Sequence, residues 1–408
     1  MSNPIFSYFF VNNHHMSILG IFVFLFIAFI FSNNKRKINL RRILGGLILQ
    51  FLLAIFVLNT KIGHRVFSTF AEGFRILYGY SDAGIKFMFG NLIDATASWG
   101  FLFVIKVVPI IIFFGALMSL LYHIGIIQLF VKFLALIIRP ILGTSGAETL
   151  CTVGNIVLGP TEAPLLIKKY LKVMTDSEML VVMISGMSTI TASLLAIYGS
   201  MGISMIHLIT ASVMSIPGSI LISKILIPET KIPKTAVGNH MEMKKDTANI
   251  LDAVAVGTCD GLKLAANIAA MLIAFISLMA MADHILLSVI GYSLNNIFAK
   301  LFSGVAHLIG ISNQDKNTAG VLLGQKLVIN EFVAYASLVK ATLTVRSKTI
   351  LTYALCGFSN ISVIGILIGG ISALAPNKKS FLTKFGWRAL LGGTLVNLLN
   401  AAIAGLLI

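Results

Sequence analysis

Residues 159–172 read GPTEAPLLIKKYLK, and this short stretch decides the fold. Glu162 lies two residues from each of two prolines, Pro160 and Pro164, with apolar runs on both sides. Proline has no backbone N–H and clashes with the preceding turn of a helix, so this segment cannot be one uninterrupted helix. The question is why an apolar chain places an acid in a broken segment.

The composition is that of an integral membrane protein. Of the 408 residues, 57% are hydrophobic and only 11% are charged, and the mean hydropathy is +0.94. Soluble domains carry about a quarter charged residues, so this chain has too few to cover a water-soluble globule of its size. The net charge of +16 does not indicate nucleic-acid binding, because the lysines and arginines are spread along loops, as the positive-inside rule describes.

Eight segments are apolar and long enough to cross a lipid bilayer, which takes roughly 20 residues in a helix. They are 16–32, 43–59, 99–122, 178–202, 204–227, 264–291, 349–371 and 386–408. An even number places both termini on one side, and the basic loop 33–42 and linker 228–248 put that side outside. Two other stretches, 61–90 and 126–139, mix basic and apolar residues at helical spacing and are predicted to lie along the interface.

Two further stretches, 146–172 and 318–345, are too apolar for loops and too short for two crossings. Each carries an acid near its middle, Glu162 or Glu331, and each precedes a membrane span. Non-helical backbone is tolerated at membrane depth only where it is buried in protein or lines a wet cavity. Both stretches are therefore predicted to be re-entrant hairpins.

The two hairpins belong to an internal repeat. Each is followed by a span interrupted at Gly-x-Ser-x-Ile, within GMSTITAS at 186–193 and GFSNISVIG at 357–365, and then by one further span. The order of hairpin, broken helix and helix thus occurs twice, with an odd number of crossings between the copies, which makes the repeat inverted. Secondary transporters place substrate and ion sites at the midplane between such repeats.

The residues around the hairpins suit the binding of a polar solute and a cation. An ionisable group at membrane depth is costly unless paired, hydrated or protonated, so Glu162 and Glu331 are candidate ligands. Carboxylates accept hydrogen bonds from vicinal hydroxyls or from an amino-bearing ring edge. Asn155 and Thr189 add neutral oxygens, which suit a weakly held Na⁺.

Plainer readings exist for several of these residues. Glu162 would be a surface acid if its hairpin were a loop beside the neighbouring lysines, and Phe358 would only pack in the core. Asp252 and Asp260 are predicted to lie on a solvated helix face. The sequence shows no phosphate loop, Cys/His metal cluster or nucleophile–base arrangement, so the chain is predicted not to be an enzyme.

Four stretches in order resemble the signatures of the concentrative nucleoside transporter family: GPTEAPLLIKKYL, GMSTITAS, NEFVAY and ALCGFSNISVIGILIGG. The resemblance covers nearly the whole chain and is densest from 143 to 372. It implies an all-α fold of eight transmembrane helices and two re-entrant hairpins in inverted repeats, assembled as a homotrimer in a bacterial-type inner membrane. It also implies import of nucleosides, coupled to Na⁺ or H⁺, by an elevator-like motion.

This family fold gives the expected organisation of the chain. Residues 1–142 hold scaffold spans 1–3 with interfacial helices, and 143–227 form the first transport repeat. Residues 228–317 hold the polar linker, interfacial helices and scaffold span 6, and 318–408 form the second transport repeat.

The resemblance also assigns site residues. It implies base contacts for Thr161 and Glu162, ribose contacts for Glu331 and Asn360, and a pocket-lining role for Phe358. The sodium ligands that it implies are the side chains of Asn155 and Thr189 and the backbone carbonyls of Leu158 and Ile190. Because proton-coupled relatives tend to lack this site, Asn155 favours Na⁺ over H⁺.

Two positions depart from the family pattern. Pro160 stands where the family usually has a base-contacting glutamine, and proline offers no side-chain hydrogen bond. Val363 stands where the family has a ribose-side serine, and Gln325 is a candidate for a replacement amide. These changes keep an alternative open: a symporter of the same fold for another small polar solute. A passive channel is a weaker alternative.

Overall fold

The structure, a computed structural model, describes residues 13–93, 102–235 and 247–408, and within these ranges it contains helices and no strands. The first half contains α2 (His14–Ile30), η2 (Lys35–Lys37), α3 (Leu40–Asn59), α4 (Lys61–Phe89), η3 (Gly90–Ile93), α5 (Phe103–Ile124), α6 (Ile126–Leu142), α7 (Gly146–Gly154), η4 (Ala163–Ile167), α8 (Lys168–Leu171), α9 (Asp176–Ser188), α10 (Ala192–Ser200) and α11 (Met205–Leu226). The second half contains α12 (Ile250–Ile290), α13 (Leu294–Leu308), α14 (Lys316–Val328), α15 (Glu331–Lys340), α16 (Val345–Leu355), α17 (Ile361–Leu374), η5 (Pro376–Lys378) and α18 (Lys379–Leu407).

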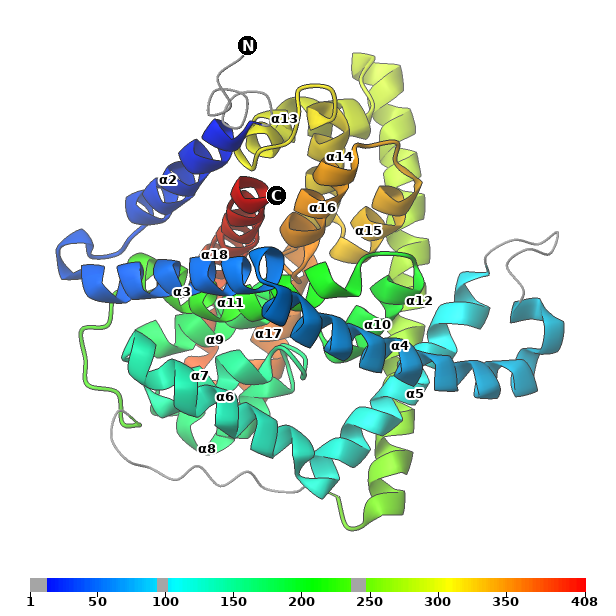
Figure 1. The fold of residues 1–408 in the computed structure, drawn as a ribbon, viewed down its shortest axis with the longest axis horizontal. Coiled ribbons are helices and arrows are strands. Elements are labelled where there is room, and N and C mark those ends of the chain that lie inside the picture. The colour runs from blue at the N-terminus through cyan, green and yellow to red at the C-terminus, as the bar shows by residue number, and fades with distance from the viewer. Residues whose placement is uncertain (1–12, 94–101, 236–246) are drawn as a thin grey trace.

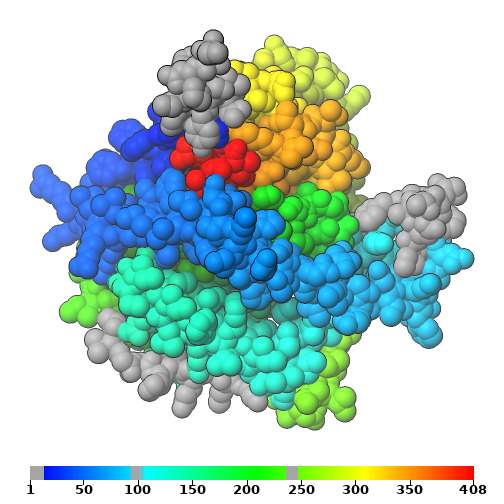
Figure 2. Space-filling view, viewed as in Figure 1, coloured from blue at the N-terminus to red at the C-terminus, as the bar shows by residue number. Residues whose placement is uncertain are grey.

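The apolar helices coincide with the segments predicted to cross the membrane. Among the described residues, six helices are long and apolar enough to cross: Leu40–Asn59, Val104–Ile124, Asp176–Ser200, Met205–Leu226, Ile250–Ile290 and Pro376–Leu407. The shorter apolar helices His14–Ile30 and Ile361–Leu374 match the two remaining predicted spans. The stretches predicted to lie along the interface form α4 and α6, and α4 crosses the front of the molecule with α3 (Figure 1 and Figure 2).

The helix that contains the predicted span 264–291 begins well before it. The helix begins at Ile250 and continues for 41 residues as α12, which runs from top to bottom in the right-hand part of the view, with α4 and α5 extending past it (Figure 1). In the sequence, residues 250–263 look like a separate amphipathic stretch. They contain no proline that would end a helix, however, and their two glycines pack against α5. A Cβ atom added at Gly257 would lie 2.5 Å from the carbonyl oxygen of Gly115, and one added at Gly261 would lie 2.9 Å from that of Ile111.

Helices α9 to α11 and α18 form the buried centre. In the most apolar 18-residue segment of the helical stretch that contains α18, 78% of the segment is buried inside the protein. In the corresponding segment of α12, 11% is buried. Helix α18 packs against α2, α9, α11, α16 and α17, so elements from both predicted repeats meet on it. The outer helices instead present large apolar side chains outward, as expected for a surface in contact with lipid.

The helix interruptions expected for the two predicted hairpins and the two broken spans are present in the chain trace. In the first hairpin, α7 ends before Asn155, and η4 begins after Glu162, with Pro164 in its first turn, where proline is tolerated. In the second hairpin, only Ile329 and Asn330 separate α14 from α15. The following spans are also interrupted, between α9 and α10 at 189–191 and between α16 and α17 at 356–360.

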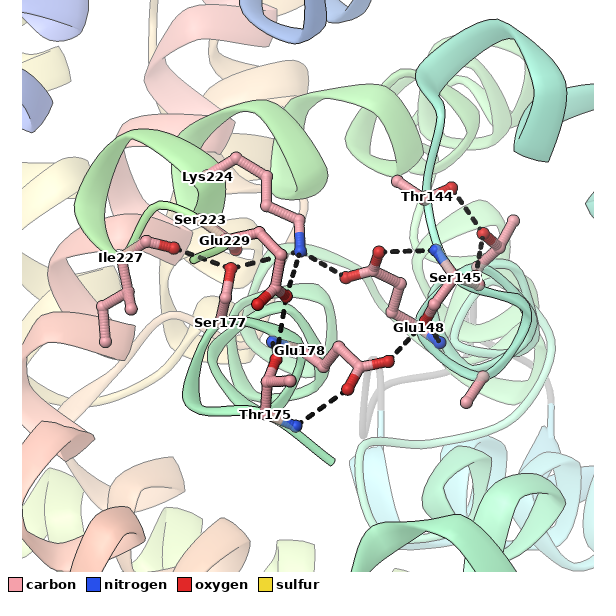
Figure 3. A network of polar contacts seen from close by, with 12 residues as sticks. Thr144, Ser145, Glu148, Thr175, Ser177, Glu178, Ser223, Lys224, Ile227 and Glu229 are labelled. Atoms are coloured by element: carbon pink, nitrogen blue, oxygen red, sulfur yellow. Dashed lines mark hydrogen bonds and ion pairs between the residues drawn. The ribbon is translucent and has the colours of Figure 1, made fainter. Parts of the chain in front are cut away.

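A buried polar network fixes the start of the first hairpin (Figure 3). The Nζ atom of Lys224, on α11, lies 2.6 Å from Oε2 of Glu148, on α7, and both residues are at most 3% exposed. Ser145 caps α7 and donates from Oγ to the carboxylate of Glu178, on α9, at 2.6 Å. The network therefore joins α7 to the helices behind it.

Replacing Lys224 with methionine is expected to destabilise the protein by about 3–5 kcal/mol, because it leaves the carboxylate of Glu148 buried and unpaired. The measurement is the thermal unfolding midpoint of the purified protein in detergent. Arg75→Met is the control, since the pair of Arg75 with Glu72 is exposed and such pairs contribute little to stability. An equal loss in the two variants would contradict the expectation, and Glu148→Gln added to Lys224→Met should restore part of the stability.

Candidate substrate and cation sites

The structure brings Glu331 and Asn360 together at the second helix break. Glu331 is the first residue of α15, and its buried carboxylate accepts hydrogen bonds from Asn360 Nδ2 and from the hydroxyl of Tyr198, both at 3.2 Å. Asn360 caps α17, because its Oδ1 accepts from the backbone N–H of Val363 at 3.2 Å. The side chain of Val363 itself is buried and adds no polar group.

Glu162 lies in a separate cavity of about 370 Å³. This cavity is bounded by the first hairpin, by the start of α10, and by α5 and α12. The polar residues that line it in the described part of the chain carry hydroxyl or carboxylate groups: Ser119, Tyr122, Glu162, Thr191, Ser193, Thr247 and Asp260. Among the described residues, the lining offers two carboxylates, which accept hydrogen bonds, and no lysine, arginine, histidine or amide side chain.

The helix α10 connects the two halves of the candidate site. Thr191, its N-cap residue, lines the cavity beside Glu162, and Tyr198, near its other end, contacts Glu331. The two residues are seven positions apart along the helix, which is roughly 10 Å along its axis. Glu331, Asn360 and Phe358 do not line the cavity that contains Glu162.

The other predicted substrate residues take different positions. A Cβ atom added at Gly186, on α9, would lie 2.9 Å from Pro160, and one at Gly370, on α17, would lie 2.8 Å from Thr161. The hairpin tip is thus packed between the two broken helices. Gln325 is buried in α14, and its Oε1 has no hydrogen-bond partner among the described residues.

Asn155 and Thr189 form a set of oxygens suited to a cation. Asn155 is buried and donates from Nδ2 to Ser185 Oγ at 2.9 Å, while its Oδ1 has no partner in the described part of the chain. Thr189 donates its hydroxyl to the carbonyl of Ser185 at 2.9 Å, which leaves the lone pairs of its oxygen free to bind a cation. A buried oxygen left without a partner costs free energy, and a bound cation would remove that cost. The buried residues Leu158 and Ile190 lie next to this set in the chain.

Comparisons with known proteins decide the family. The family models described as Na⁺ dependent nucleoside transporter C-terminus and N-terminus match residues 207–405 and 19–92, and the one described as nucleoside recognition matches 104–205. The chain is 38% identical to the nucleoside permease NupC of Helicobacter pylori, with 96% of this chain and 97% of that protein covered. The chain belongs to the concentrative nucleoside transporter family.

Other concentrative nucleoside transporters agree with this assignment. The sodium/nucleoside cotransporter 1 of Rattus norvegicus is 38% identical over 96% of this chain and 63% of its own length. The solved structure of CNTnw in an inward-facing substrate-bound state has a TM-score of 0.91 at 36% identity, and covers 96% of this chain and 97% of that one. The protein is therefore a multi-pass membrane transporter and not an enzyme, as predicted.

Three residues near the sites of this nucleoside transporter are missing from the sequence-based prediction. Asn397 and Lys326 hydrogen-bond to each other at 2.7 Å beside the second helix break, and Tyr198 contacts Glu331. An amide or an ammonium inside an apolar helix is a signal that sequence reasoning could have used for Asn397 and Lys326. Tyr198 gave no such signal, because a tyrosine in an apolar helix is also an ordinary core residue.

The structure adds a second feature to the prediction for Asp260. It is exposed and lies 3.7 Å from Lys263, as expected of a solvated face, but it also lines the cavity beside Glu162. The reason is that α12 begins at Ile250 and passes the first hairpin, so this face of the helix borders the cavity.

Proposed function

We propose that the protein is a symporter that imports nucleosides across the inner membrane with Na⁺ as the coupling ion. The observation that carries this proposal is the contact between Glu331 and Asn360 at one helix break, next to a buried oxygen set, Asn155 and Thr189, at the other. The carboxylate and amide suit the vicinal hydroxyls of a ribose, and the oxygen set suits a monovalent cation. Glu162 and Thr161 would contact the base from the first hairpin, with Phe358 lining the pocket.

The transport cycle we propose is alternating access of the elevator type. The two predicted transport repeats, 143–227 and 318–408, would move together past the scaffold formed by 1–142 and 228–317, in a homotrimer. Helix α18 packs against α9, α11, α16 and α17 of the two repeats, which favours their movement as one body, and it also packs against α2 of the proposed scaffold, past which it would have to slide. The termini would lie on the outer side, as the distribution of basic loops suggests.

Uptake into proteoliposomes tests the proposal. Radiolabelled uridine and adenosine should accumulate against a gradient when Na⁺ is imposed outside, and the accumulation should collapse when Na⁺ is replaced by choline. Uptake that follows a pH gradient and ignores Na⁺ would reject sodium coupling, and equilibration without accumulation would indicate a channel. Failure of all nucleosides would favour the alternative that Pro160 and Val363 raise, a symporter for another small polar solute.

Nucleosides with an amino group on the base are expected to be preferred over their carbonyl counterparts by about threefold to tenfold, or about 1 kcal/mol. The reason is that the cavity around Glu162 offers two carboxylates, whose hydrogen bonds from an amino group are charge-assisted, whereas its hydroxyls can donate to a base carbonyl only as neutral groups. Competition assays compare cytidine with uridine and adenosine with inosine, because within each pair the amino group becomes a carbonyl and the adjacent ring nitrogen gains a single N–H. Asp260→Ser should reduce the preference, while Asp252→Ser, on the same helix and outside the cavity lining, should not. An unchanged preference in Asp260→Ser would contradict this role.

A further inference from the structure

Asn397 uses the full hydrogen-bonding capacity of its side chain at the point where the two helix breaks meet. It lies on α18, is fully buried, and makes four hydrogen bonds: Nδ2 donates to the carbonyls of Ser188 at 2.8 Å and Cys356 at 2.7 Å, and Oδ1 accepts from Ser359 at 2.9 Å and Lys326 at 2.7 Å. An amide has two N–H donors and one oxygen with two lone pairs, so none is left over.

The amide nitrogen of Asn397 hydrogen-bonds to the backbone at both helix breaks. Ser188 is the last residue of α9 and Cys356 follows the last residue of α16, so both carbonyls belong to helix ends, which lack partners within the helix. The breaks also touch directly, because the backbone N–H of Phe358 donates to the carbonyl of Thr189 at 3.2 Å. Thr189 belongs to the proposed cation site and Phe358 to the proposed substrate pocket.

The acceptor side fixes the orientation of the amide. Lys326 comes from the second hairpin and also donates to the carbonyl of Ala354, at 2.7 Å. Turning the amide over would point its NH₂ group at the ammonium of Lys326 and its oxygen at two carbonyls, which is unfavourable on both sides. Gly357 makes room for the contact, since a Cβ atom there would lie 2.5 Å from Asn397 Oδ1.

We propose that Asn397 is the positioning residue that couples cation binding to substrate binding. A cation bound at Asn155 and Thr189 restricts the backbone of the first break. Through its hydrogen bonds to both breaks, Asn397 then restricts the backbone of the second break, where Ser359 precedes Asn360. Coupling between two sites is reciprocal, so substrate binding tightens cation binding by the same factor. This inference rests on the proposed sodium-coupled function.

The test compares Asn397→Leu with a matched control, Asn400→Leu. Asn400 lies one turn further along the same helix and is equally buried, but its bonds go to Gln50 on α3 and to Ser215 and Ala211 on α11. Binding of radiolabelled nucleoside to the purified full-length protein is measured with Na⁺ and with choline. We expect Na⁺ to raise the affinity at least about fivefold in the wild type and in Asn400→Leu, and less than about twofold in Asn397→Leu.

The ratio of affinities separates coupling from folding, because a merely structural residue would lower the amount of active protein and leave the ratio unchanged. If Asn397→Leu does not fold, Asn397→Asp serves, since its carboxylate still accepts from Lys326 and Ser359 but cannot donate to the two carbonyls. A wild-type ratio preserved in the Asn397 variants overturns the inference, as does an equal loss in Asn400→Leu. A ratio of one in the wild type overturns the proposed sodium coupling itself.

Discussion

Replacing Glu331 with glutamine is expected to lower nucleoside uptake at least about a hundredfold. Glutamine keeps the shape of the side chain, but it has one accepting oxygen where the carboxylate has two, and it carries no charge. Hydrogen bonds to a charged group contribute about 1.5–3 kcal/mol each, and about 1.4 kcal/mol corresponds to tenfold. Losing one such bond to a ribose hydroxyl, and the charge that strengthens the other, therefore accounts for the size of the effect.

The measurement is the initial rate of uridine uptake, divided by the amount of transporter in the membrane. Tyr198→Phe is the companion variant, because it removes one hydrogen bond to the same carboxylate but leaves the charge, and should cost less than about tenfold. Uptake by Glu331→Gln at the wild-type rate would remove Glu331 from the substrate site.

Replacing Asn155 with alanine is expected to raise the Na⁺ concentration for half-maximal uptake at least about tenfold. The variant deletes the one buried oxygen of the first hairpin that has no partner among the described residues, and a cation at this point would lose a ligand. A single oxygen contact to a charged ion contributes about 1.5–3 kcal/mol. Uptake measured over a series of Na⁺ concentrations, at constant ionic strength, gives the half-maximal value.

Gln325 provides the matched control for Asn155. It is also a buried amide in a hairpin, and its Oε1 is likewise without a hydrogen-bond partner in the described ranges. Gln325→Ala should leave the Na⁺ dependence unchanged, and a change in the nucleoside KM alone would support its predicted place near the substrate. An Asn155→Ala protein with the wild-type Na⁺ dependence would show that the cation binds elsewhere.

The sequence predicts the arrangement of helices well because the signals are strong and local. Apolar runs locate the spans, and prolines and small polar residues locate the interruptions, as at Pro164 and Thr189. The start of α12 was missed because nothing local distinguishes an amphipathic stretch that continues a span from one that is separate. The contact of Gly257 and Gly261 with α5 favours continuation of the helix through this stretch, and such a contact is a tertiary feature.

The candidate site is predicted less completely than the fold. The contact between Glu331 and Asn360 agrees with the roles that the family resemblance implies, although the roles themselves stay predictions. Asn397 and Asp260 were not assigned to a site, because their positions depend on how α18 and α12 pack against distant parts of the chain. The role of a residue that contacts both repeats cannot be recognised from the sequence of either repeat alone.

The glycine contacts between α5 and α12 limit how the cavity can change shape. These helices touch backbone to backbone at Gly115, Gly257 and Gly261, and such contacts leave no side chains between them that could rearrange. The wall that carries Asp260 is therefore stiff, whereas the opposite wall consists of a hairpin tip and an interrupted helix. In the proposed cycle, the sliding surface runs through the cavity itself, so a bound solute would lie on the boundary between the stationary and moving parts.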